Sequence, residues 1–127
     1  MSLRSDLGRV RGLGSAKTGS HHWWHQRLTA IAMVPLSLWF VSALLRHMND
    51  DFAQTAAWIS SPFITVLLLA LIITVFYHAK LGLQVVIEDY IHHELFKILT
   101  LIAMKLAVAF VALLGIVSIL KISFGTA

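Results

Sequence analysis

The sequence predicts an all-α membrane protein of three transmembrane helices, and three observations carry that prediction. Of its 127 residues, 58% are hydrophobic and only 13% are charged, whereas a soluble domain carries about 25% charged residues. The mean hydropathy is +0.82. The apolar residues gather in three runs, each near the roughly 20 residues that span a bilayer. No run alternates lipid-facing with lumen-facing residues, which disfavours a β-barrel.

Composition also narrows the classes of function. The chain has no Cys, which excludes disulfides and thiolate metal sites. Its net charge of +4 indicates membrane topology and contact with membrane lipid, and no nucleic-acid binding is expected. A chain of this length holds three spanning helices but no second soluble domain. Residues 1–20 lack the apolar core of a secretory signal, so none is expected.

Residues 1–20 are predicted to form a polar N-terminal arm, flexible or lying on the membrane surface. The arm is rich in Gly and Ser, and its basic residues are Arg4, Arg9, Arg11 and Lys17. Its 12–18 segment faintly resembles a phosphate-binding loop, but Ala16 replaces the required Gly and no strand comes before it. Nucleotide binding is therefore not expected, and the transmembrane domain is predicted over residues 21–127.

The first transmembrane helix is predicted at about residues 24–46, with a kink at Pro35, which removes one backbone hydrogen bond. Three His side chains precede its apolar run: His21, His22 and His25. The second and third of them have the i, i+3 spacing of a metal pair, but no nearby carboxylate or Cys completes such a site. Two Trp residues stand beside them, so an interfacial anchor is the favoured interpretation.

The second and third helices are predicted at about residues 60–89 and 96–121. Residues 46–61 are expected to form a polar connection, with a new helix starting near Pro62, since Pro is favourable in a first helical turn. Lys105 lies inside the third apolar run. We expect it to snorkel towards the interface, or to pair with a propionate or a lipid phosphate.

The basic residues predict the orientation in the membrane. Five lie in the N-terminal segment when Arg27 is included, whereas the first connection has Arg46 beside Asp50 and Asp51. The second connection has Lys97, with two further lysines able to snorkel towards it. The positive-inside rule then predicts a cytoplasmic N-terminus and second connection, with the first connection and the C-terminus outside.

His78 is the residue that points most directly to chemistry. An imidazole within a spanning run is costly unless it meets a partner, a cavity or a metal. Two interpretations stay open: a ring hydrogen-bonded to a neighbouring helix, or an axial haem ligand held by a rigid helix. Gly82 lies on the same helix face, where it would admit a flat macrocycle or a closely packed helix. No other His lies at this depth, so a second ligand would come from a partner chain.

Tyr90 and Asp89 end the second run, about 18 Å along the helix axis from His78. That is roughly the distance from mid-bilayer to the interface. A phenol there can donate a hydrogen bond to a quinone carbonyl, and a nearby carboxylate or His can handle protons. The alternative is an aromatic-belt Tyr among solvated charges, which is favoured when these residues are taken alone.

Together these features resemble the hydrophobic membrane-anchor D subunit of succinate dehydrogenase, respiratory complex II. That family has a His, a Gly after three intervening residues, a Gln two further on, and then an Asp-Tyr pair. The matching residues here are His78, Gly82, Gln84, Asp89 and Tyr90. The segments 27–30 and 9–16 are similar to proteobacterial and mitochondrial-type members, so the resemblance covers nearly the whole chain.

The resemblance implies a role for each matching residue. His78 would be one axial ligand of a haem b shared with the cytochrome b partner, the C subunit of that complex, with Gly82 packing near the haem. Tyr90 would hydrogen-bond ubiquinone, with Asp89 beside it. Arg27 would lie near the haem propionates and the quinone pocket.

The resemblance also implies partners and a location. The flavoprotein and iron–sulfur subunits would oxidise succinate and relay electrons, and this chain would help hold them on the membrane. It would be a multi-pass protein of the bacterial inner (cytoplasmic) membrane, with a cytoplasmic N-terminus and a periplasmic C-terminus. The isolated chain is not expected to be an enzyme.

Two other functions are considered. One is the anchor of a quinol:fumarate reductase, which runs the reverse reaction, although a single mid-membrane His and the Asp-Tyr pair favour the succinate enzyme. The other is a small proton-conducting or transporter subunit using His78 and Lys80. A transporter would show inverted repeats or helices broken at the midplane, and the sequence has neither.

Overall fold

The computed structural model describes residues 5–10 and 19–125, and within them all regular structure is helical. The helices are α1 (Asp6–Val10), α2 (Gly19–His47), α3 (Phe52–Ile59), α4 (Pro62–Tyr90) and α5 (Glu94–Ser123). The all-α prediction with three long apolar helices is therefore confirmed. The basic residues Arg4, Arg11 and Lys17 and the loop at 12–18 lie outside the described residues.

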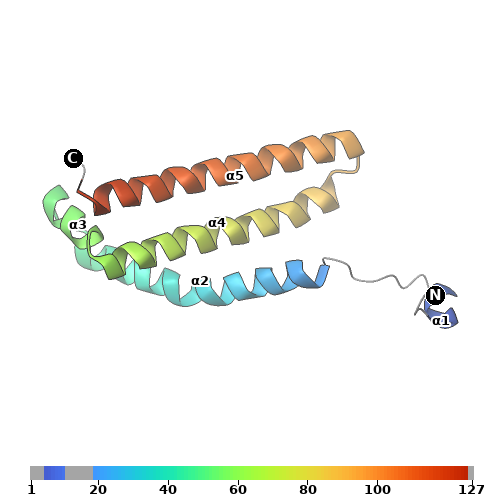
Figure 1. Ribbon diagram of the computed structural model, residues 1–127, viewed down its shortest axis with the longest axis horizontal. Helices are drawn as coiled ribbons and strands as arrows, with labels where there is room; N and C mark the ends of the chain where they lie inside the picture. The colour runs from blue at the N-terminus through green and yellow to red at the C-terminus, as the bar shows by residue number, and fades with distance from the viewer. Residues whose placement is uncertain (1–4, 11–18, 126–127) are drawn as a thin grey trace.

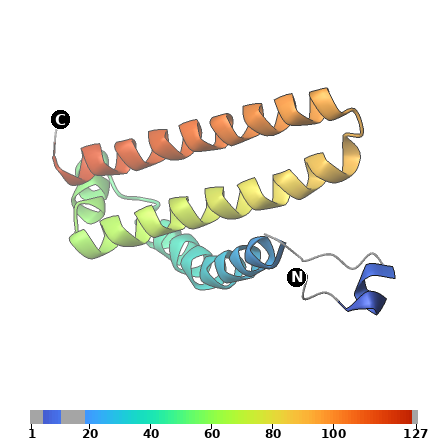
Figure 2. The ribbon, with the colours of Figure 1, turned by 45° about the vertical axis from the view of Figure 1, so that its right-hand side comes forward.

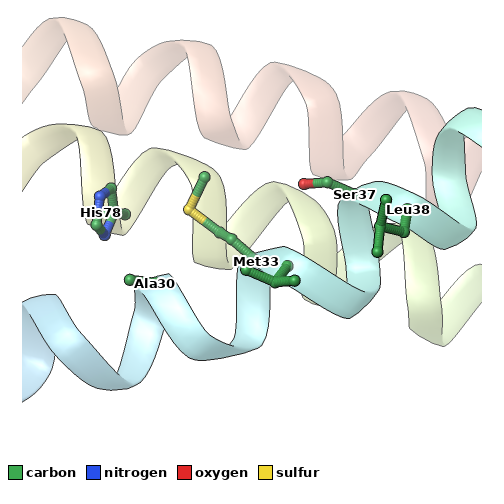
Figure 3. A pocket seen from close by; sticks show the side chains of 6 residues that line it. Ala30, Met33, Ser37, Leu38 and His78 are labelled. Atoms are coloured by element: carbon green, nitrogen blue, oxygen red, sulfur yellow. The ribbon is translucent and has the colours of Figure 1, made fainter.

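The helices α2, α4 and α5 lie side by side and alternate in direction, with α4 in the middle (Figures 1 and 2). The start of α2, the end of α4 and the start of α5 are at one end of the bundle. At the other end α3 connects α2 to α4 and packs on α4 and α5. We call the first of these the Tyr90 end and the second the α3 end. His78 lies on the side of α4 that meets α2 (Figure 3).

Helices α2, α4 and α5 are long and apolar enough to cross a membrane, yet they bury little of their own surface. In the most apolar 18-residue stretch of each helix, the share of buried residues is 6% in α2, 17% in α4 and 0% in α5. The buried side chains of the described residues are Ala43, Thr65, Leu68 and Leu81, three of them on the central helix α4. A helix that is apolar all round and not covered by its own chain faces lipid or other transmembrane helices.

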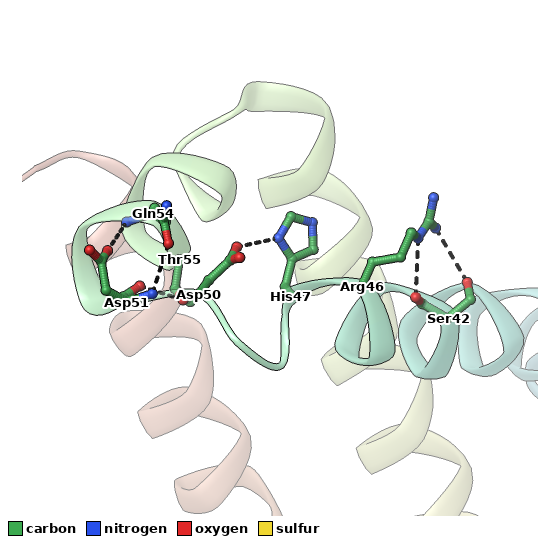
Figure 4. A network of polar contacts seen from close by, with 7 residues as sticks. All are labelled: Ser42, Arg46, His47, Asp50, Asp51, Gln54 and Thr55. Atoms are coloured by element: carbon green, nitrogen blue, oxygen red, sulfur yellow. Dashed lines mark hydrogen bonds and ion pairs between the residues drawn. The ribbon is translucent and has the colours of Figure 1, made fainter.

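The connection between the first two spans differs from the sequence expectation, because it contains the helix α3. Its start is a capping box: Asp51 Oδ1 accepts from the Gln54 backbone N–H at 2.8 Å, and Gln54 Oε1 accepts from the Asp51 backbone N–H at 2.9 Å. Before it, His47 pairs with Asp50 (Figure 4). The His47 ring also stacks on Trp58, with ring centroids 4.5 Å apart. These contacts make the polar segment fold back on the bundle.

Hydrogen bonds made by hydroxyl groups connect the helices at the α3 end. The Ser60 hydroxyl shares its hydrogen between the Ala56 carbonyl at 2.7 Å and the Ile122 carbonyl at 3.2 Å, and the second contact joins the end of α3 to the end of α5. The buried Thr65 hydroxyl lies 2.8 Å from the Ser123 hydroxyl and donates to the Ile59 carbonyl at 2.7 Å. A buried hydroxyl needs such partners, so this end of the bundle has a defined register.

The helix limits also differ from those expected. Helix α2 begins at Gly19, before the expected residue 24, so the His and Trp residues lie inside it. Helix α4 runs without a break to Tyr90. Helix α2 changes direction along its length in Figures 1 and 2, and Pro35 lies inside it. A missing backbone N–H is the usual cause of such a bend.

Candidate functional site

The site is built around the imidazole of His78, which α4 presents to α2. Its Nδ1 lies 2.9 Å from the Thr29 hydroxyl oxygen. Its Nε2 lies 3.4 Å from the side-chain nitrogen of Gln26. Both α2 residues face α4 because they stand three residues apart, on one side of the helix. His78 is partly buried, so its ring is held between two helices rather than directed into open lipid.

The contacts of Thr29 favour one tautomer of a neutral His78. The Thr29 hydroxyl has one hydrogen, and its oxygen lies 2.7 Å from the His25 carbonyl oxygen and 3.1 Å from the Gln26 carbonyl oxygen. When the hydroxyl donates to one of these carbonyls, it accepts from His78 Nδ1–H. The second nitrogen, Nε2, then keeps its lone pair, which faces the side-chain nitrogen of Gln26. This tautomer is the one that a metal ligand binding through Nε2 requires.

Two open grooves border the His78 ring. One, of about 400 Å³, extends along α2 past Ala30, Met33, Ser37 and Leu38 (Figure 3). The other, of about 320 Å³, is lined by Gln26, Arg27, Ala30, Ile31 and His78. Ala30 belongs to both, so a small side chain leaves space on either side of the imidazole. A planar, largely apolar group can lie in such a space with one polar edge towards Arg27.

Gly82 lies one turn after His78 and faces Gln26. A Cβ at position 82 would lie 3.6 Å from the Gln26 side-chain nitrogen, which is ordinary van der Waals contact. Within this chain Gly82 therefore brings α4 close to a polar side chain of α2. The Gln26 side-chain oxygen is buried and has no hydrogen-bond partner among the described residues. Such an atom normally has a partner, so Gln26 marks a place where a further donor fits.

The structure brings Arg27 to the His78 site but keeps Tyr90 and Asp89 apart from it. Arg27 is exposed, lies over the Trp23 ring at 4.6 Å and lines the same groove as His78. Tyr90 is the last residue of α4 and is 80% exposed, and Asp89 is exposed beside it. Tyr90 is at the same end of the bundle as the start of α2.

A second polar group, which the sequence interpretation missed, joins α2 to α4. The Tyr77 hydroxyl lies 3.0 Å from His25 Nδ1, with the rings 5.8 Å apart. The Lys80 ammonium lies over the Tyr77 ring at 4.3 Å. Thr29 and Gln26 were missed as well. The available signal was that polar residues recur along one face of α2, at positions 22, 25, 26 and 29.

The His residues at the start of α2 do not gather into a metal site. The rings of His21 and His25 are 6.5 Å apart, and the latter binds Tyr77. Within residues 5–10 and 19–125, no group of three His, Cys, Asp or Glu side chains is close enough to hold a metal ion.

Comparison with known proteins gives one consistent answer. Residues 1–119 match the family model described as succinate dehydrogenase/fumarate reductase transmembrane subunit. The chain is 41% identical over 117 residues to the succinate dehydrogenase hydrophobic membrane anchor subunit of Rickettsia bellii, covering 84% of this chain and 94% of that protein. It is 38% identical to the protein of the same name from Rickettsia conorii, covering 83% and 93%.

More distant relatives carry related names. The succinate dehydrogenase hydrophobic membrane anchor subunit of Paracoccus denitrificans is 28% identical over 81 residues, which is 64% of this chain and 63% of that protein. No solved structure matches the chain significantly. The likeness therefore rests on sequence, and it spans the helices that carry His78 and Tyr90.

Proposed function

The chain belongs to the family of succinate dehydrogenase hydrophobic membrane anchor subunits, and from this premise we propose that it binds haem b with a partner subunit and helps form a ubiquinone-reduction site. In this role it takes part in electron transfer from succinate to ubiquinone. The observation that carries the proposal is the His78 ring, whose Nδ1 lies 2.9 Å from the Thr29 hydroxyl and which borders two grooves.

The residues around His78 suit a haem. The imidazole offers a neutral nitrogen, the neighbouring small Ala30 leaves room on both sides, and Gln26 has an unsatisfied buried oxygen. Arg27 supplies a cation at the groove that leads to the Tyr90 end, where a propionate would be received. When bound, haem supplies a one-electron redox centre. His78 would hold the haem iron from this chain, and the cytochrome b partner would supply any further protein ligand, since α4 offers one imidazole at this depth.

Thr29 acts in this proposal by holding the His78 ring. By accepting from Nδ1–H it fixes both the tautomer and the rotation of the imidazole, as partners of metal-bound His residues do in other proteins. Its own hydrogen has the His25 carbonyl as an acceptor 2.7 Å away. A metal bound at Nε2 would take the place of the Gln26 side-chain nitrogen, which lies 3.4 Å from that atom.

We assign the quinone to the Tyr90 end. Reduction of ubiquinone takes up two electrons and two protons, so the site needs polar groups and contact with water. Tyr90 is exposed there and its phenol is not engaged with another described residue. Asp89 beside it provides a carboxylate for proton handling. The soluble flavoprotein and iron–sulfur subunits would dock at this same end and deliver electrons to it.

Succinate oxidation is favoured over fumarate reduction by the names of the relatives, each a succinate dehydrogenase subunit, although the family model covers both enzymes. A transporter is disfavoured because α4 runs unbroken through His78, whereas transport sites are built on broken helices. We place the chain in the bacterial inner membrane as a multi-pass anchor with a cytoplasmic Tyr90 end.

The Tyr90→Phe variant tests the quinone assignment. Loss of the phenol hydroxyl leaves a quinone carbonyl unpaired, which costs roughly 1–3 kcal/mol, or about 5- to 150-fold in rate or affinity. We expect the purified complex to oxidise succinate with a soluble artificial acceptor as the parent does, but to reduce ubiquinone at least several-fold more slowly. Equal ubiquinone reduction by variant and parent would make Tyr90 an interfacial anchor only.

A further inference from the structure

A groove between α4 and α5 carries two lysines from separate helices. Its volume is about 230 Å³, and it is lined by Lys80 and Tyr77 on α4 and by Lys105, Val108 and Ala112 on α5, among others. None of its lining residues belongs to the two grooves beside His78. Lys80 follows His78 by two residues, which is more than half a turn around the helix, so the groove opens on another side of α4.

The groove is polar at one end and apolar along the rest. Lys80 is nearer the Tyr90 end than the other α4 residues that line it, because α4 runs towards that end. Lys105 is likewise nearer that end than the other α5 lining residues, because α5 runs away from it. The two lysines therefore stand at the end of the groove nearer the Tyr90 end, and their long stems can snorkel towards that interface. Ile73, Val108 and Ala112 continue the groove towards the α3 end.

Neither ammonium has an acidic partner in the described part of the chain. The ion pair found there is His47 with Asp50, at the opposite end of the bundle. Lys80 rests on the Tyr77 ring at 4.3 Å, a contact that leaves its charge uncompensated, and Lys105 is exposed. Two neighbouring cations within spanning helices are costly unless an anion joins them.

We propose that Lys80 and Lys105 bind the phosphate of an anionic phospholipid, whose acyl chain lies along the apolar part of the groove. A lipid brings a negative charge, which the two lysines can meet by snorkelling towards the interface, together with a hydrocarbon tail that suits the apolar part of the groove. A carboxylate from another protein chain would itself have to be buried in the membrane at a cost. Basic pockets between transmembrane helices bind lipid head groups in this way.

Native mass spectrometry of the purified complex can test the proposal. The parent complex, the double variant Lys80→Gln/Lys105→Gln and the control Lys97→Gln are each equilibrated with micelles containing equal phosphatidylglycerol and phosphatidylcholine. The control removes the same charge from α5, but Lys97 does not line the groove. A parallel arm adds excess inorganic phosphate. Each lysine near an anionic lipid contributes about five-fold in affinity, so we expect the double variant to retain about 25-fold less phosphatidylglycerol.

The parent and the Lys97→Gln control should both retain phosphatidylglycerol over phosphatidylcholine, also in the presence of inorganic phosphate. Equal retention by the double variant and the parent would overturn the proposal, as would equal retention of the two lipids. Complete displacement by inorganic phosphate would show a free-anion site instead. Loss of another subunit without loss of lipid would show that a protein carboxylate pairs with the lysines.

A second pair of variants keeps the test valid if the double variant does not assemble. Lys80→Arg/Lys105→Arg keeps both charges and should retain the lipid as the parent does. Val108→Trp keeps the lysines but fills the apolar part of the groove, so it should lower lipid retention several-fold. Unchanged retention in Val108→Trp would contradict the position given to the acyl chain.

Discussion

Thr29 has one hydrogen to donate, and the direction in which it donates decides the chemistry open to His78. When it donates to the His25 carbonyl, 2.7 Å away, an oxygen lone pair is left to accept from Nδ1–H. A Thr29→Val variant keeps the shape of the side chain but removes the acceptor. Loss of such a supporting partner typically costs 10- to 100-fold in metal affinity, so we expect haem to leave Thr29→Val complexes at least ten-fold more readily in a haem-transfer assay.

The matched control is Thr29→Ser, which keeps the hydroxyl in the same place and should hold haem as the parent does. A structural role for the methyl group alone would give the reverse order, with Val tolerated and Ser impaired. This comparison separates a positioning role of Thr29 from simple packing between α2 and α4.

The His78→Ala variant tests the ligand itself. Removal of the imidazole leaves a cavity next to Ala30 but no unpaired charge in the membrane, so α4 should still insert and pack against α2. We expect the low-spin, six-coordinate haem spectrum of the purified complex to change to that of a haem with one protein ligand, with added imidazole restoring it in part. An unchanged spectrum, after exclusion of a substitute ligand such as His25, would disprove ligation by His78.

The sequence alone predicted His78 and the Tyr90 pair but not the residues that hold His78. An imidazole inside an apolar run stands out by composition, because its cost in the membrane is independent of what surrounds it. The contributions of Thr29 and Gln26 depend on which side of α2 faces α4, and that register is decided by tertiary packing. The Tyr77–His25 contact was missed for the same reason, since its two residues are 52 positions apart.

At the scale of elements, the three spans followed from hydropathy, whereas α3 did not. The segment 52–59 is short and its flanking residues are polar, so its sequence shows no helical period. The helix is stabilised by the Asp51–Gln54 capping box and by the stacking of Trp58 on His47. In the sequence these contacts appear only as isolated residues, which do not by themselves predict a helix. The end of the first connection was predicted well, because Pro62 is favourable at the start of a helix.

The contact between α4 and α5 depends on Gly115. A Cβ there would lie 2.9 Å from Ile72 Cδ1, so the missing side chain lets the two helices approach, as small residues do between transmembrane helices. We expect Gly115→Val to lower the stability of the bundle by about 1–3 kcal/mol, a typical cost of overpacking. Thermal unfolding of the complex in detergent would measure the loss.

Ile72→Ala provides the rescue. The closest atom to the new Cβ belongs to the end of the Ile72 side chain, so Gly115→Ala should cost little, and Gly115→Val/Ile72→Ala should recover part of the stability lost in Gly115→Val. If the two substitutions are simply additive, the overpacking lies elsewhere and the contact between Gly115 and Ile72 does not set the helix separation.

At the scale of the whole molecule, the chain has little core of its own. The three spans leave most of their apolar side chains exposed, and α5 has no buried residue. A bundle of this kind is completed by lipid and by other subunits, which agrees with its membership of a family of subunits. The same geometry puts the two candidate sites on different sides of α4: the grooves beside His78 on the side that meets α2, and the lysine groove on the side that meets α5.

The orientation of this bundle is the prediction with the widest consequences, because it decides which end meets the soluble subunits. At the Tyr90 end lie Arg27 and Lys97, and the basic N-terminal arm precedes α2 in the sequence, whereas the α3 end has Asp50 and Asp51 beside Arg46. Basic residues are retained in the cytoplasm, so we expect a reporter active only outside the cytoplasm to be silent when fused after residue 20 and active when fused in the Asp50 loop or after residue 125.

A reporter that is silent in the Asp50 loop would overturn this orientation, and with it the docking of electron-delivering subunits beside Tyr90. Chemical labelling gives an independent measurement, since the chain has no Cys and a single introduced Cys is therefore unambiguous. Asn49→Cys should react with a membrane-impermeant reagent in intact cells, and His92→Cys only after the cells are opened. If His92→Cys reacts first, ubiquinone reduction at Tyr90 would draw its protons from outside the cell membrane, and the quinone site would have to be sought at the α3 end.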